Sequence, residues 1–150
     1  MRLKLINISS LITLYNGIYA IAVGIFMVIF SRFLIKKYFE PFPEIWEILV
    51  KKWIRDISQY HLILIYTGFL LVSFGIFIIY LSAFIMKRKD NLAWAVLFFG
   101  GLIGWAGIFV VNILAKNFIM IVLSFLGWAS FVIGMVIPIK YYLQKGYPRF

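Results

Sequence analysis

The sequence predicts an all-α polytopic membrane protein, with four transmembrane helices in an antiparallel bundle and one interfacial amphipathic helix between helices 1 and 2. Hydrophobic residues make up 65% of the 150 residues and charged residues 13%, which is more apolar surface than a water-soluble domain of this length can bury. The charges also leave four uncharged segments, each longer than the roughly 20 residues that cross a bilayer as a helix. Residues 1–150 are therefore expected to form a single transmembrane domain.

The first expected span covers approximately residues 5–32, where no charge lies between Lys4 and Arg32. Because lipid offers backbone N–H and C=O groups no partners, a segment of this kind must be helical. Its basic start resembles a signal peptide, but the apolar run continues to Phe30 and is too long for the hydrophobic region of such a signal. We expect a retained helix.

The long connection after this span carries a helical pattern that follows Pro41 and Pro43. Polar residues recur there at spacings of three and four: Glu44, Glu47, Lys51, Arg55 and Ser58. Apolar residues occupy the opposite face: Trp46, Leu49, Val50, Trp53 and Ile57. The pattern predicts an amphipathic helix over approximately residues 43–58 that lies in the headgroup region. Packing of this helix on a partner protein is the alternative.

The remaining spans are expected over approximately residues 61–86, 91–115 and 117–142. Short polar connections separate them, and Asp90 or Asn91 and then Asn117 are placed to cap the helices that follow. Short connections make consecutive spans antiparallel neighbours.

The net charge of +10 comes from Lys and Arg residues that flank the apolar segments, which favours membrane anchoring over nucleic-acid binding. With the N-terminus inside, eight basic residues face the cytoplasm and seven face the other side. The cluster at Lys87–Lys89, opposite a lone Lys116, favours a cell-membrane protein with both termini in the cytoplasm.

Glycines recur in every span as pairs seven residues apart. The pairs are Gly17 and Gly24, Gly68 and Gly75, Gly100 and Gly107, and Gly127 and Gly134. Ser10 and Thr13 extend the first stripe, Ser82 extends the second, and Gly104 completes a GxxxG motif with Gly100. Because membrane helices associate by close backbone approach at small residues, these positions are predicted to form the helix-packing surfaces. General glycine enrichment of membrane helices is the alternative.

Polar side chains within the spans are few. Asn16 and Asn112 are expected to form interhelical hydrogen bonds, with a contact to a headgroup or a quinone as the alternative. The single histidine, His61, is expected to form an interfacial hydrogen bond and is the weak candidate for a cofactor ligand. Trp46, Trp53 and Trp94 are expected in the interfacial aromatic belts, whereas Trp105 and Trp128 are expected to pack against glycine notches.

No Asp, Glu, Lys or Arg lies deep within a span, and the chain has no cysteine, so the sequence indicates no catalytic residues, no metal and no cofactor. We expect a non-catalytic accessory or structural subunit of a larger membrane complex, although enzyme activity is left open. The first alternative is a lipid- or quinone-binding membrane protein, as a carrier or an enzyme. The second is an oligomeric pore or transporter. The expected partners are the bilayer and other membrane subunits, in a hetero- or homo-oligomer, without nucleic acid.

Overall fold

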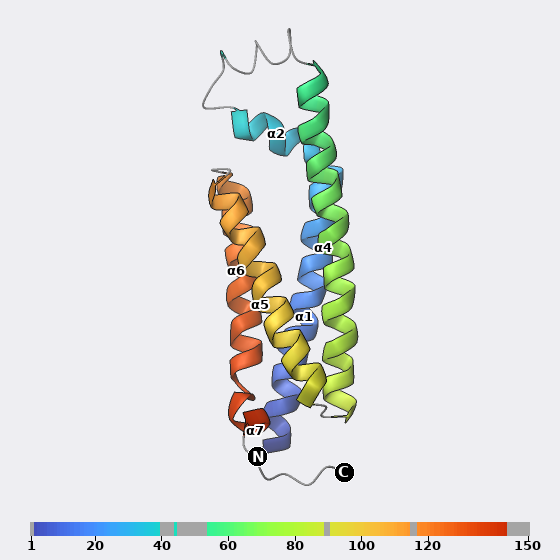
Figure 1. Ribbon diagram of the computed structural model, residues 1–150, viewed down its shortest axis with the longest axis vertical. Coiled ribbons are helices and arrows are strands. Elements are labelled where there is room, and N and C mark those ends of the chain that lie inside the picture. The colour runs from blue at the N-terminus through green and yellow to red at the C-terminus, as the bar shows by residue number, and fades with distance from the viewer. Residues whose placement is uncertain (1, 40–43, 45–53, 89–90, 115–116, 144–150) are drawn as a thin grey trace. The chain divides into compact units, whose positions relative to one another are not determined.

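The computed structural model describes residues 2–39, 44, 54–88, 91–114 and 117–143, and every regular element in these ranges is a helix. The helices are α1 (Arg2–Ile29), α2 (Ser31–Phe39), α4 (Ile54–Arg88), α5 (Asn91–Leu114), α6 (Phe118–Val136) and α7 (Ile139–Leu143) (Figure 1). Four segments are long and apolar enough to cross a membrane: Asn7–Ile29, His61–Ile85, Asn91–Leu114 and Phe118–Val136. The predicted all-α class and the four apolar helices are confirmed.

The first helix bends before the end of its expected span. Bonds from Phe30 N to Phe26 O and from Leu34 N to Phe30 O, both 2.9 Å, carry the backbone through the bend. The Ser31 hydroxyl donates to Val28 O at 3.1 Å, a side-chain to backbone bond of the kind that bends helices. Beyond this point α2 turns away from the axis of α1 (Figure 1), which the sequence analysis did not predict.

The second apolar helix begins earlier than expected. Residues 54–58, the end of the predicted interfacial helix, form the first turns of α4 instead. No glycine or proline lies between Ile54 and Gly68, so the chain has no helix breaker at which the two segments would separate. Glu44 is helical and exposed, whereas residues 45–53, with Trp46 and Trp53, lie outside the described part of the chain.

Specific residues explain where α6 begins and where it ends. The predicted cap is confirmed, because the Asn117 side chain accepts a hydrogen bond from Met120 N at 3.3 Å. At the other end the expected span over 117–142 is interrupted, because Pro138 has no N–H to donate to the carbonyl four residues earlier. The short helix α7 follows, with Tyr142 N bonded to Pro138 O at 3.3 Å.

The described helices fall into two compact units. The first unit comprises Met1–Tyr19 and Gly75–Phe150, and so combines the start of α1, the end of α4, and α5, α6 and α7. The second unit, Ala20–Phe74, combines the end of α1, α2 and the start of α4.

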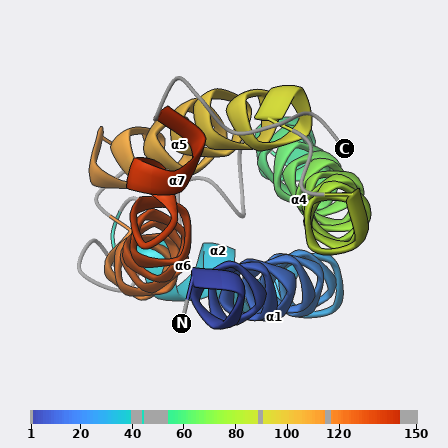
Figure 2. The same ribbon diagram turned by 90° about the horizontal axis from the view of Figure 1, so that it is seen from below.

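Helices α5 and α6 of the first unit lie side by side (Figures 1 and 2). Gly101 contacts Phe131, and Trp105 contacts Gly127, so residue numbers fall along α6 as they rise along α5. Farther along the pair, the Phe109 ring lies 5.8 Å from the Phe125 ring. These pairings define an antiparallel hairpin.

Candidate functional site

The most connected polar residue of the first unit is Asn16, which joins three helices. Its side chain, 2% exposed, donates from Nδ2 to Gly127 O at 2.7 Å and to Ser130 Oγ at 2.8 Å. Its Oδ1 accepts from the indole N–H of Trp105 at 3.0 Å. Since an indole N–H can only donate, this bond sets the orientation of the amide. Asn16 therefore forms the interhelical bonds that its intramembrane position predicts.

Tyr19 adds a second bond from α1 to α6, one turn beyond Asn16. Its hydroxyl donates to Leu123 O at 2.8 Å, and its ring lies 6.1 Å from the ring of Trp105. Trp105 is fully buried and touches the same two helices. The sequence analysis assigned Tyr19 no role, although its spacing of three residues from Asn16 places both on one face of α1.

Nearer the start of α1, serine hydroxyl groups bond this helix to α4 and to α6. Ser10 Oγ donates to Ser82 O at 2.6 Å, and the Ser82 hydroxyl donates in return to Ser10 O. Ser9 Oγ donates to Gly134 O. All three serines are buried. Ser10 and Ser82 were predicted as small packing residues, and the structure adds direct bonding to that role.

The bond from Ser9 to Gly134 explains how the first unit tolerates Pro138. In an uninterrupted helix, the N–H of residue 138 would donate to the carbonyl of Gly134. Proline has no N–H, so that carbonyl lacks its helical donor, and the Ser9 hydroxyl from α1 supplies one instead. The helix break in α6 and the serine of α1 thus form one structural feature.

Several of the predicted packing glycines lie where two helices touch. A Cβ on Gly17 would lie 2.9 Å from Gly75 O in the first unit. In the second unit, a Cβ on Gly24 would lie 2.6 Å from Gly68 O, and one on Gly68 would lie 2.7 Å from Gly24 O. These backbones approach so closely that no side chain fits between them.

The glycines of α6 also face neighbouring helices. A Cβ on Gly127 would overlap the Trp105 ring, and one on Gly134 would lie 2.9 Å from Thr13 Oγ1. Gly101, which was not among the predicted packing residues, receives the ring of Phe131 in the same way. Its position four residues before Trp105 is the signal that could have identified it, because both then share one face of α5.

The three predicted glycines of α5 lie elsewhere. Gly100 is exposed, and the nearest atom to its Cβ position is Phe77 Cε1 at 4.0 Å. Gly107 is exposed with nothing within 4 Å among the described residues, and Gly104 is half-buried. The interval of seven places Gly100 and Gly107 on one face, but Gly101 and Trp105 turn a different face inward. Within the described residues, Gly100 and Gly107 are thus left exposed.

Comparison with known proteins found no relative of this chain. The chain matches no family model, no curated protein and no solved structure.

Within the described residues, neither Asn112 nor His61 has the hydrogen bond to a neighbouring element that the sequence suggested. Asn112 Nδ2 donates to Ile108 O at 2.9 Å, within its own helix, so the expected interhelical bond is replaced by a local one. His61 is half-buried in the second unit, and its Nδ1 has no partner within the described residues. These residues contain no group of three His, Cys, Asp or Glu side chains that could hold a metal ion.

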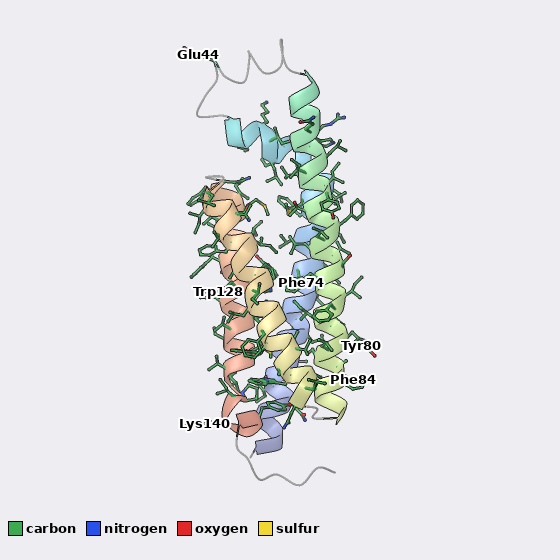
Figure 3. All side chains as sticks on the ribbon, viewed as in Figure 1. Glu44, Phe74, Tyr80, Phe84, Trp128 and Lys140 are labelled. Carbon is green, nitrogen blue, oxygen red and sulfur yellow. The ribbon has the colours of Figure 1, made fainter. Side chains whose placement is uncertain are left out.

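Trp94 lies in the first turn of α5, where the sequence predicts an interfacial tryptophan. It is buried, and its ring stacks on Phe98 at 5.3 Å and on Tyr142 at 5.0 Å. Trp128, labelled in Figure 3, stacks on Phe109 at 6.5 Å from the opposite helix. Aromatic packing therefore adds to the hydrogen bonds between the helices of the first unit.

Proposed function

We propose that the protein is a non-catalytic integral membrane protein that serves as an accessory or structural subunit of a larger membrane complex. The supporting observation is that α5 turns two of its three predicted packing glycines, Gly100 and Gly107, outward. Glycines that allow two helices to touch are occupied elsewhere in the chain, whereas Gly100 and Gly107 are exposed. A helix of another subunit is the neighbour that such notches accommodate in lipid.

The distribution of burial supports the same proposal. Of the most apolar window of each candidate span, 39% is buried in α1 and 33% in α6, but 17% in α5. Large apolar side chains flank the open glycines, including Phe99, Ile103 and Val111. A surface with alternating notches and large side chains offers another helix more contact than a uniformly bulky one.

The polar centre of the first unit supports a structural role. Asn16 uses both amide hydrogens and its carbonyl oxygen within the chain, and Ser9, Ser10 and Ser82 bond to other helices. Groups engaged in this way hold helices together and are not available for a substrate.

For the topology, we propose that the four spans form one antiparallel bundle in the cell membrane with both termini in the cytoplasm. In the first unit, Ser9 and Asn16 of α1 bond to Gly134 and Gly127 of α6, so the two helices are paired in opposite directions. The basic cluster at Lys87–Lys89 supports the cytoplasmic side.

The subunit proposal is tested by extracting the protein in native-lipid particles and measuring the mass of the complex that contains it. We expect the wild-type chain in a stoichiometric complex with at least one further membrane protein. Gly107→Leu should release the lone chain, because the new side chain fills the notch that the partner helix would occupy.

Val110→Leu is the matched control, since it enlarges an already large exposed side chain on the same helix. It should leave the complex intact. A wild-type chain that runs alone in native-lipid particles, or a Gly107→Leu complex of unchanged mass, would contradict the proposal.

A further inference from the structure

The helix ends of the first unit gather basic residues at one level. Within Met1–Tyr19 and Gly75–Phe150 the sequence has nine basic residues, and eight of them adjoin, along the chain, the start of α1, the end of α4 or the stretch that follows α6. Asp90 is the one acidic residue in these segments. Lys116, in the connection between α5 and α6, is the ninth basic residue.

The register of the hydrogen bonds shows which of these residues share a level. Ser10 lies opposite Ser82, and Gly17 lies opposite Gly75. The two helices are therefore antiparallel, and each residue forward along α1 matches one residue back along α4. Extending this register by six residues from Ser10 brings Lys4 level with Arg88.

The same reasoning places α7 at this end of the unit. Ser9 lies beside Gly134, and from this contact Lys4 lies five residues back along α1 and Lys140 six residues on, past the end of α6, so both lie toward the same end of the unit. The bond from Tyr142 N to Pro138 O keeps the chain helical beyond the break. Lys140 is exposed, and Figure 3 shows it at the end of the unit where α1 begins.

We name Arg2, Lys4, Lys87, Arg88 and Lys140 the basic rim. These residues come from three helices, and Lys4, Arg88 and Lys140 lie at the same end of the unit, just beyond the apolar spans Asn7–Ile29, His61–Ile85 and Phe118–Val136. That level is where the phosphates of a bilayer lie when the apolar segments occupy its hydrocarbon core.

We infer that the basic rim is a binding surface for the headgroups of anionic phospholipids. Charge complementarity supports this occupant, because a phosphate in the headgroup layer is the anion that a rim at this depth meets. Basic side chains that come from several helices can bind one headgroup together. A run of charges within one connecting segment does not offer this arrangement. The inference concerns lipid and does not depend on the accessory-subunit proposal.

Native mass spectrometry of the full-length chain in detergent tests the inference. The probes are dioleoyl phosphatidylglycerol, which is anionic, and dioleoyl phosphatidylcholine, which is zwitterionic with the same acyl chains. The wild-type protein should bind phosphatidylglycerol more tightly. Each charge in such a cluster contributes about fivefold to affinity, so Lys4→Gln/Arg88→Gln/Lys140→Gln should weaken phosphatidylglycerol binding on the order of 100-fold.

The matched control is Arg32→Gln/Lys36→Gln/Lys37→Gln, which removes three exposed basic side chains from α2 and gives the same net charge. It should retain the preference for phosphatidylglycerol. Lys4→Arg/Arg88→Lys/Lys140→Arg keeps every charge and should bind like the wild type, which separates loss of charge from loss of fold.

Three results would overturn the inference: equal affinity of the wild type for both lipids, an unchanged preference in the rim variant, or an equal loss in the α2 control. A fourth is rim-dependent binding of a short DNA duplex to the protein in phosphatidylcholine nanodiscs. That result would show that the basic rim binds a water-soluble polyanion and not a lipid headgroup.

Discussion

Asn16 illustrates how one buried amide can join three helices. Removing it takes from the Gly127 carbonyl its donor on α1, although the Ser130 hydroxyl still donates to that carbonyl, and takes from the Trp105 indole N–H its acceptor on α1. Hydrogen bonds between membrane helices contribute modestly, about 0.6 kcal/mol on average, because the separated helices also find partners. Asn16 forms three such bonds, so its effect should exceed that of a typical intramembrane amide.

We expect Asn16→Leu to lower the free energy of unfolding in mixed micelles by about 1 to 2 kcal/mol. Asn112→Leu is the control, because the Asn112 amide bonds within its own helix. It should change stability by less than about 0.5 kcal/mol. Equal effects of the two substitutions would show that Asn16 does not join the helices.

The glycines are of two kinds: at some, a neighbouring helix occupies the space that a side chain would need, and at others that space is empty within the described residues. Gly127→Ala adds a methyl group that overlaps the Trp105 ring, and overpacking of this kind costs about 1 to 3 kcal/mol. Gly107→Ala adds the same group in open space and removes the flexibility of glycine, so it should be neutral or stabilise the isolated chain by up to about 1 kcal/mol. Chemical unfolding of the two purified variants measures the difference, and destabilisation by both would contradict the assignment of Gly107 to an open face.

At the scale of elements, the break between α6 and α7 is coupled to α1. The Ser9 hydroxyl donates to the carbonyl that Pro138 cannot serve. A residue with an N–H at position 138 would restore the donor within α6. Positions 9 and 138 therefore both determine whether the Gly134 carbonyl has a donor.

A double-mutant cycle tests this coupling. Ser9→Ala alone should destabilise the protein by about 1 kcal/mol, because it leaves Gly134 O without a donor from α1. In a Pro138→Ala background the same change should have a smaller effect, since the backbone N–H of the introduced alanine can donate to that carbonyl. The unfolding free energies of the four proteins give the interaction term, and strict additivity would show that the two sites are independent.

For the whole molecule, the testable claim is the topology that we propose. The chain has no cysteine, so single-cysteine variants have no background labelling. In inside-out membrane vesicles, Lys140→Cys should react with a membrane-impermeant maleimide, and Lys116→Cys should react in right-side-out vesicles. Labelling of both positions from the same side would show that the segment between them does not cross the membrane, and would contradict the proposed topology.

The sequence predicted the elements of the molecule better than its interruptions. Four apolar segments could be recognised because hydrocarbon requires a minimum length of uncharged helix. Asn117 could be assigned as a cap from its residue type and position. The bend at Phe30 was missed, because an apolar run does not show where a helix axis changes direction. The early start of α4 was missed, because the amphipathic pattern over residues 43–58 was interpreted as a separate helix.

The sequence by itself determined which residues share a face of each helix, since helical periodicity depends on spacing alone. It thereby placed Gly17 and Gly24 on one stripe and Gly100 and Gly107 on another. Which way each face turns was decided by tertiary structure. Gly17 meets Gly75, whereas Trp105, bonded to Asn16 and packed on Gly127, turns the other face of α5 inward. Spacing cannot decide this, because the direction of a face depends on contacts with other helices.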